Sequence, residues 1–324
     1  WISSAPAMWL DGTVLAGIKA GKKVGLARLV PPTKRRQPPV EKWFYATANP
    51  IFTSAAVVGE HVFVVDGRAG QQGRKLHCLN AESGQPLWTR PVAVDAPGHL
   101  TATPSAVMVL DEANRLTCIS AASAAEAGPT VTWQATVSSP VGMPAIAGDL
   151  VLLAQRSPSG VVALDIVAGR KLWWGPLDAP VTTGVISRED LAVVGTDRGL
   201  AAIGLWDGRA RWAVPAKGIA GVLVGDRRHL ALTTAAGEVL IFDWSGQKVA
   251  QATGAVGGLP PLLIGDRALL CQAEALALMD LGNGRTKLWL KTGWLGDVTA
   301  SPILADSHLY FGTNEKGLVC VRAR

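Results

Sequence analysis

Short apolar runs separated by turn residues follow one another along this chain. Residues 62–65, 150–153 and 309–311 are typical runs, and each follows a short segment that contains Gly, Asp or Ser. Runs of this length, bounded by turn residues, predict β-strands. The pattern therefore predicts an all-β protein built from many short strands.

The predicted strands fall into units that open alike. Each opening has small residues, often with a proline, and then a hairpin turn, as in Met143-Pro144-Ala145 before Gly148-Asp149. Eight such openings occur. We predict eight units of up to four strands, at residues 1–46, 47–91, 92–136, 137–177, 178–215, 216–253, 254–292 and 293–324.

A recurring tryptophan marks these units more clearly than their opening segments do. The copies are Trp43, Trp88, Trp133, Trp173, Trp212 and Trp289. Ala250 stands where one further copy is expected, and with it the copies are 38 to 45 residues apart. A period of about 40–45 residues is that of a β-propeller blade. The repeat therefore predicts one closed domain over residues 1–324, an eight-bladed β-propeller of four-stranded antiparallel blades.

Each tryptophan ends a longer sequence motif, which is clearest from Asp165 to Trp173 and from Asn80 to Trp88. The motif predicts a strand, a tight turn whose glycine takes a positive φ, and a strand that ends in a large aromatic. Such an aromatic can lie flat between neighbouring blades. These motifs and openings resemble those of the pyrroloquinoline-quinone-like β-propeller family. The resemblance covers nearly the whole chain and implies that the six tryptophans have structural docking roles.

The eighth unit differs from the others, since it ends at Arg324 with no outer strand and no docking tryptophan. Propellers commonly complete their last blade with a strand from the other end of the chain. We therefore expect the last blade to lack its outer strand unless residues upstream of Trp1 supply it, in a longer natural polypeptide.

Cysteine and histidine positions follow the repeat. Three of the four cysteines fall at one register of the third strand, and three of the five histidines directly precede a second strand. Such repeated positions indicate packing roles, and the chain has no Cys-x-x-Cys or Cys-His cluster of the kind that binds zinc. We predict no catalytic residue, no cofactor and no metal.

Composition narrows the possible partners. The net charge of +6 suits an acidic partner or an anionic surface. We predict no nucleic-acid binding, because the positive charge is spread thinly and no stacking aromatics interleave with it. No stretch of about 18 uninterrupted apolar residues is present, which predicts no transmembrane helix.

Three connections exceed the minimal repeat, at residues 30–39, 67–74 and 121–130. Insertions into a regular unit are more often functional than the unit itself. We therefore predict a partner-binding face formed by these connections, with contacts at Lys34, Arg35, Arg36, Arg68, Gln71, Gln72 and Arg74.

The resemblance implies three functions. The first is a non-catalytic protein-binding scaffold or accessory subunit of a periplasmic, cell-envelope complex, as in the cofactor-free propeller lipoproteins of the outer-membrane β-barrel assembly machinery. The second is an exported ligand-sensing domain of a larger protein, such as a membrane kinase. The third is a quinone-dependent dehydrogenase. We favour the scaffold. The near-minimal units and the lack of adjacent cysteines argue against the dehydrogenase, and residues upstream of Trp1 would distinguish the scaffold from the sensing domain.

Overall fold

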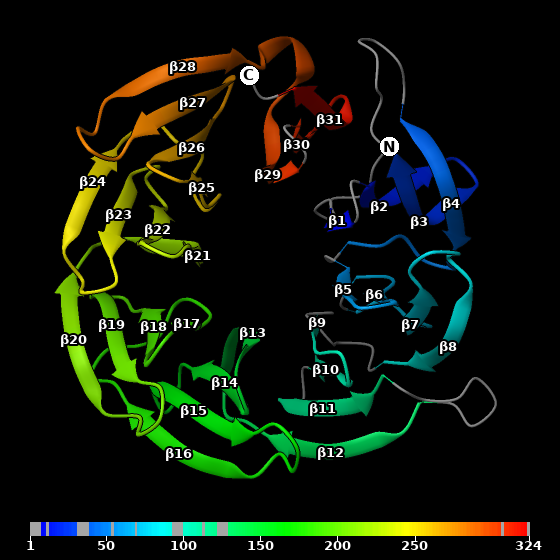
Figure 1. Ribbon diagram of the computed structural model, residues 1–324, viewed down its shortest axis with the longest axis horizontal. Helices are drawn as coiled ribbons and strands as arrows, with labels where there is room; N and C mark the ends of the chain where they lie inside the picture. Colours follow the sequence, from blue (N-terminus) through cyan, green and yellow to red (C-terminus); the bar gives the residue numbers. More distant parts are fainter. Residues whose placement is uncertain are drawn as a thin grey trace. The chain divides into compact units, whose positions relative to one another are not determined.

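The computed structural model describes residues 8–10, 13–30, 39–52, 55–68, 70–92, 100–111, 114–121, 129–305 and 308–322. These residues are almost wholly β, with one short 3-10 helix, η1 (Gly293–Leu295). Figure 1 shows the strands gathered into separate sheets in chain order. We number the sheets blade 1 to blade 8.

One compact unit comprises residues 1–136 and 302–324. Its first three blades are β1 (Met8–Leu10), β2 (Thr13–Ala20), β3 (Lys23–Val30) and β4 (Val40–Ala46); β5 (Ala56–Val58), β6 (His61–Val65), β7 (Lys75–Asn80) and β8 (Pro86–Pro91); and β9 (Leu100–Ala102), β10 (Ala106–Leu110), β11 (Arg115–Ser120) and β12 (Val131–Thr136).

A second compact unit comprises residues 137–301. Its four blades are β13 (Pro140–Ala147), β14 (Leu150–Gln155), β15 (Gly160–Asp165) and β16 (Lys171–Pro176); β17 (Ile186–Arg188), β18 (Leu191–Gly195), β19 (Gly199–Gly204) and β20 (Ala210–Pro215); β21 (Ile219–Gly225), β22 (His229–Thr234), β23 (Val239–Asp243) and β24 (Lys248–Ala252); and β25 (Leu262–Ile264), β26 (Arg267–Gln272), β27 (Ala275–Asp280) and β28 (Thr286–Lys291).

Blade 8 consists of β29 (Val298–Ala305), β30 (His308–Thr313) and β31 (Gly317–Arg322). Seven four-stranded sheets and this three-stranded one make an all-β, eight-bladed propeller fold, which confirms the predicted fold class. Each sheet lies within one of the eight predicted repeat units. Because no fourth strand pairs with β31 among the described residues, its residues Leu318 to Val321 are only half-buried.

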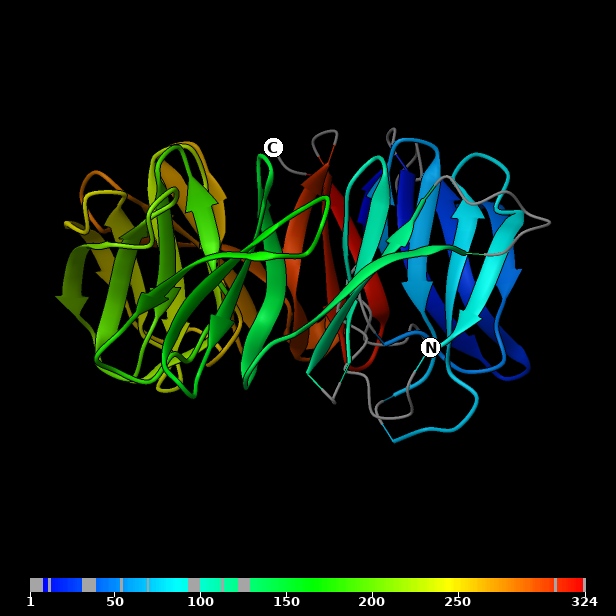
Figure 2. The same cartoon turned by 90° about the horizontal axis from the view of Figure 1, so that it is seen from below.

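The strands of each blade are antiparallel and paired in chain order, so successive connections leave at alternate ends of the sheet. Connections between strands one and two and between strands three and four share one end, which we call end A. The connection between strands two and three lies at the other end, which we call end B. Figure 2 shows strands from the side, with hairpins at both ends of the sheets.

The core lies between the faces of successive blades. Alternating strand residues point into these contacts, as expected for a pleated sheet packed on its neighbours. Leu15 and Leu26 of blade 1 pack with Val62 and Val64 of blade 2 in one buried cluster. A second cluster joins blades 4 and 5 through residues such as Leu152 and Val194.

Tryptophan rings lie against turn glycines of the next blade. In the described part of the chain, such contacts include Trp43 on Gly84, Trp173 on Gly208 and Trp212 on Gly246. A Cβ atom at these glycines would come within 2.5, 2.6 and 3.0 Å of the respective ring. The same glycines have φ values of +65° to +86°, a region that L side chains disfavour. Glycine is therefore required for both the backbone and the ring contact.

Blade 7 departs from this pattern by one residue. Leu276 pairs with Leu290 and Ala277 with Leu288, so Trp289 falls in a β-bulge between them. The five other repeat tryptophans each lie opposite a third-strand residue. The shift arises because five residue steps separate Gly284 from Trp289, whereas four separate Gly84 from Trp88.

Candidate protein-binding surfaces

The predicted contact residues fall into two groups. Lys34, Arg35 and Arg36 lie outside the described residues. Within the β6–β7 connection, Arg68 and Gln72 are exposed, Gln71 is half-buried and Arg74 is buried. Burial removes Arg74 from the candidate contacts, since only 2% of it reaches solvent.

Arg74 and Gln71 instead anchor the β6–β7 connection. Arg74 Nε donates to the carbonyl of Asp66 at 3.2 Å, and its side-chain stem lies against Gly67. Gln71 donates through Nε2 to Asn49 Oδ1 and accepts from the backbone N–H of Arg68 at 3.2 Å. These contacts hold the connection at its base and leave Arg68 and Gln72 facing outward.

A buried polar cluster supports this anchor. The Asp66 carboxylate is fully buried, accepts the Lys75 N–H at 2.6 Å and lies 3.5 Å from His77 Nε2. Burial alone would raise the pKa of Asp66, but the close approach of the His77 ring and the hydrogen bond from the Lys75 N–H outweigh it and hold the pKa below its ordinary value. His77 Nδ1 lies 3.0 Å from Tyr45 Oη of blade 1. Burial, and then the Asp66 charge, raise the pKa of Tyr45.

The β4–β5 connection joins the β6–β7 connection to the β2–β3 hairpin. Thr47 N–H donates to Val24 O at 2.9 Å, beside the hairpin, and Gly67 N–H donates to Pro50 O at 2.8 Å. Both elements are end B connections of the first compact unit. The Arg68 guanidinium also lies 4.2 Å from the centre of the Phe52 ring.

Positive charge gathers on blade 1. Residues 1–46 hold eight Lys and Arg against two Asp and Glu, a net charge of +6 that equals that of the whole chain. Lys19 and Lys22 of the β2–β3 hairpin are exposed. With Arg68 and Gln72 they form what we call the basic surface.

The three long connections do not leave at the same end of their blades. Residues 30–39 join strands three and four of blade 1, as residues 121–130 do in blade 3, so both are end A connections. The β6–β7 connection is an end B connection of blade 2. Since Lys42 at the start of β4 contacts the β7–β8 turn, end A of blade 1 adjoins end A of blade 2. The β6–β7 connection and the described ends of residues 30–39 therefore lie at opposite ends of their blades, and most of residues 30–39 lie outside the described residues.

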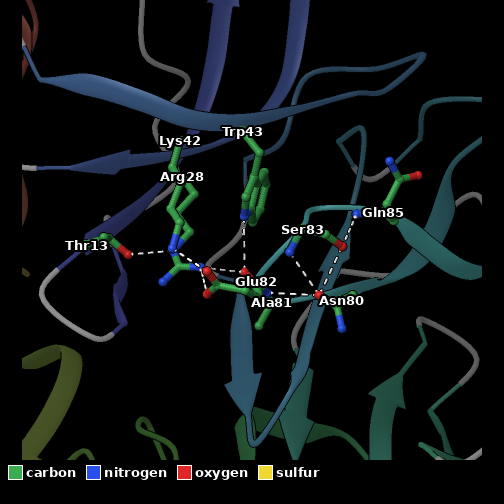
Figure 3. Close-up of polar contacts among 9 residues, drawn as sticks. All are labelled: Thr13, Arg28, Lys42, Trp43, Asn80, Ala81, Glu82, Ser83 and Gln85. Carbon is green, nitrogen blue, oxygen red and sulfur yellow. Dashed lines mark hydrogen bonds and ion pairs between the residues drawn. The ribbon is translucent and has the colours of Figure 1, made fainter.

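Sequence reasoning missed an ionic clamp between blades 1 and 2, shown in Figure 3. Arg28 is 2% exposed and donates to Thr13 Oγ1 at 2.7 Å, Ala81 O at 2.9 Å and Glu82 Oε2 at 2.7 Å. Lys42 binds the other carboxylate oxygen of Glu82. These hydrogen bonds, first from Lys42 and then from Arg28, lower the pKa of Glu82 from its ordinary 4.5 to about 2. The four side chains thus tie two blades together at end A.

The equivalent turn of blade 5 carries an exposed aromatic. Glu82 stands two residues before Gly84, and Trp206 stands two residues before Gly208. Trp206 is 62% exposed, and its ring reaches the β13–β14 turn of blade 4, where a Cβ on Gly148 would lie 3.8 Å from Cη2. Val167 occupies the same turn position in blade 4 and is 79% exposed. We call Val167, Trp206 and the turn residues Gly148 and Asp149 the Trp206 patch.

The cysteine side chains take part in the packing of the sheets. Cys78, Cys118 and Cys271 are buried and unpaired, and burial raises the pKa of the Cys78 and Cys271 thiols to about 12. Within the described ranges, no group of three or more His, Cys, Asp or Glu side chains has the arrangement of a metal site. No helix in the described part of the chain is long and apolar enough to cross a membrane.

The repeated sheets define a β-propeller protein with pyrroloquinoline-quinone-like repeats. The family model described as outer membrane protein assembly factor BamB matches residues 11–253, and the chain belongs to that family. A comparison with curated proteins gave no match.

Solved structures share the fold at low sequence identity. BamB from Moraxella catarrhalis is 15% identical with a TM-score of 0.73, over 98% of this chain and 92% of that one. The computationally designed Ika8 protein is 11% identical with a TM-score of 0.73, over 99% and 96%. Sqt1 from Saccharomyces cerevisiae is 12% identical with a TM-score of 0.74, over 100% and 95%. At these identities the likeness shows the fold and assigns no function.

Proposed function

We propose that the chain is a non-catalytic protein-binding scaffold or accessory subunit of a cell-envelope complex in the periplasm. Membership of a family described as an outer-membrane assembly factor supports this proposal. The observation that carries it is the anchored β6–β7 connection, which holds Arg68 and Gln72 outward beside the exposed lysines of the β2–β3 hairpin.

An anchored, positively charged surface suits a protein partner. Because the connection is fixed by Asp66 and Arg74, little further ordering of the chain is needed on binding, which favours affinity. The charge of Lys19, Lys22 and Arg68 favours an acidic protein surface and speeds its association. We therefore assign an acidic subunit of the complex as the partner of the basic surface.

Site-specific photo-cross-linking in native cells tests this proposal. A photoreactive phenylalanine analogue at Gln72 should capture one or a few envelope proteins, which mass spectrometry identifies. The same residue at Arg285, an exposed turn position in blade 7, is the matched control. The proposal fails if position 72 captures no more than position 285 and the full-length protein is recovered alone.

Charge reversal separates specific from general attraction. Exchanging Lys19, Lys22 and Arg68 for glutamate should reduce partner recovery strongly and remove its salt dependence. The control exchanges three other exposed basic residues, Arg285, Lys287 and Lys291. Equal losses in both variants would show that only net charge matters and would contradict a defined surface.

A further inference from the structure

We infer that the Trp206 patch binds a partner segment with an apolar side chain flanked by lysine or arginine. This inference rests on the proposed scaffold function and adds a second contact surface with its own partner chemistry. The patch lies at end A of blades 4 and 5, both within residues 137–301.

Hydrogen bonds and ring contacts place the members of the patch together. The Ile166 N–H, next to Val167, donates to the carbonyl of Asp149 at 2.9 Å. Gly148 precedes Asp149 and underlies the Trp206 ring. Val167 and Trp206 therefore lie on either side of one hairpin turn, on two successive blades.

The turn of blade 5 does not require Trp206 for its own packing. Leu205, the residue before it, is 3% exposed and fills the core, while the Trp173 ring packs on Gly208. The same tip position holds Glu82 in blade 2, Gly282 in blade 7 and Trp244 in blade 6; Trp244 differs from Trp206 because it is half-buried and donates to the carbonyl of Asp226 at 3.0 Å. Trp206 is thus 62% exposed and is not needed to form its turn. Tryptophan is one of the residue types that contribute most of the binding energy at protein interfaces.

Two exposed aspartates adjoin the patch and would attract a basic partner, while Arg170 and Arg209 of the same two turns are also exposed. Asp149 lies beside Gly148, and Asp190 accepts the Leu205 N–H through its carbonyl at 2.7 Å, next to Trp206. Both aspartates are exposed, and neither carboxylate forms an ion pair within the described residues. Nearby Arg211 is engaged by Asp207 at 2.9 Å. A lysine or arginine of the partner would meet a carboxylate and the face of an indole at the same place.

A random 12-residue peptide library displayed on phage supplies the probe. We expect selection on the full chain to enrich peptides with one aromatic or aliphatic residue flanked by Lys or Arg. Selection in parallel on a Trp206→Ala variant should not enrich them. The inference is overturned if both proteins enrich the same peptides, or if no peptide is enriched on the wild-type chain.

Affinities of the leading peptide then test each member of the patch. Trp206→Ala should weaken binding by at least about tenfold, as for a central interface aromatic. Asp149→Asn combined with Asp190→Asn should weaken it by about threefold to tenfold and flatten its salt dependence. Trp294→Ala is the matched control, since Trp294 is 71% exposed and lies in η1, away from these turns in sequence. An equal loss with Trp294→Ala, or no loss with Trp206→Ala, contradicts the inference.

Capture from native cells separates this inference from the scaffold proposal. If Trp206→Ala recovers the same envelope proteins as the wild type and the selection fails, the scaffold stands and the patch assignment falls. If the wild type recovers no partner but the selected peptides still require Trp206, the envelope-complex assignment falls and the patch stands.

Discussion

Blades 1 and 2 pack together in the same way as blades 4 and 5. The two contacts differ in the residue at the tip of the turn between strands three and four of the second blade. In both, a tryptophan ring packs on a turn glycine of the next blade, Trp43 on Gly84 and Trp173 on Gly208. Both tip side chains are largely exposed, Glu82 at 71% and Trp206 at 62%, but the Glu82 carboxylate is paired with Arg28 and Lys42 of blade 1, whereas the Trp206 indole has no charge to pair.

Four positions around these contacts change character together. By strand register and turn position, Thr13, Arg28, Lys42 and Glu82 correspond to Leu150, Ala163, Leu172 and Trp206. The first set is polar and forms the clamp, while the second is apolar and leaves Leu172 and Trp206 exposed. The comparison indicates that the ring-on-glycine contact suffices to pack two blades, which frees the surrounding positions for a clamp or for binding.

The largest expected effect comes from the element that both contacts share. Gly84→Ala places a Cβ 2.5 Å from the Trp43 ring at a φ of +69°, so we expect a loss of about 2–5 kcal/mol of unfolding free energy. Chemical denaturation followed by tryptophan fluorescence measures the loss.

Gly284→Ala is the control for this substitution. Gly284 has the same φ of +69°, and a Cβ added there would meet open space within 4 Å, so the variant should lose only the backbone contribution of about 1–2 kcal/mol. Equal losses at the two glycines would show that the ring contact contributes nothing.

Removing the clamp should have the next largest effect. Arg28→Ala makes the blade 1 position equal to Ala163 of blade 4 and leaves a cavity without the hydrogen bonds to Thr13 and Glu82. We expect a loss of about 2–4 kcal/mol in unfolding free energy, with Arg28→Lys intermediate. An Arg28→Ala protein as stable as the wild type would mean that blades 1 and 2 pack as blades 4 and 5 do, without ionic help.

The clamp also predicts a pH dependence. Because the folded pKa of Glu82 lies near 2, below its ordinary 4.5, its contribution is fully present above pH 4.5 and is lost as the pH falls toward 2. The difference in denaturation midpoint between the wild type and Glu82→Gln should therefore shrink across this interval. A difference that stays constant from pH 5 to pH 2 would contradict the ionic role of Glu82.

Sequence patterns predicted the fold because the repeat fixes it locally. The turn glycines and tryptophans recur at the spacing of one blade, and the absence of a final tryptophan motif marked the three-stranded last blade. The register shift at Trp289 follows from one extra residue between the turn glycine and the tryptophan of blade 7. These features depend on a few neighbouring residues and are therefore visible in the sequence.

The candidate surfaces were less predictable because they depend on residues from different blades. Burial of Arg74 follows from its contacts with Asp66 and Gly67, and the clamp joins Arg28 to a carboxylate 54 residues away. One indication was available in the sequence. Arg28 stands at the third-strand register that holds Cys78 and Ala163 in other blades. Because that position is buried, a charged side chain there needs an ion-pair or hydrogen-bond partner.

The most direct test of the comparison makes the same substitution at both tips and measures unfolding at pH 7. We predict that Glu82→Gln lowers the denaturation midpoint, because the buried Arg28 guanidinium loses its charged partner, which lies exposed at the edge of the blade contact. Trp206→Gln should change the unfolding free energy by no more than about 0.5 kcal/mol, as expected for an exposed side chain outside the packing contacts. A destabilised Trp206→Gln protein beside an unchanged Glu82→Gln protein would contradict the account, because it would make Trp206 the structural tip and leave Glu82 without a role.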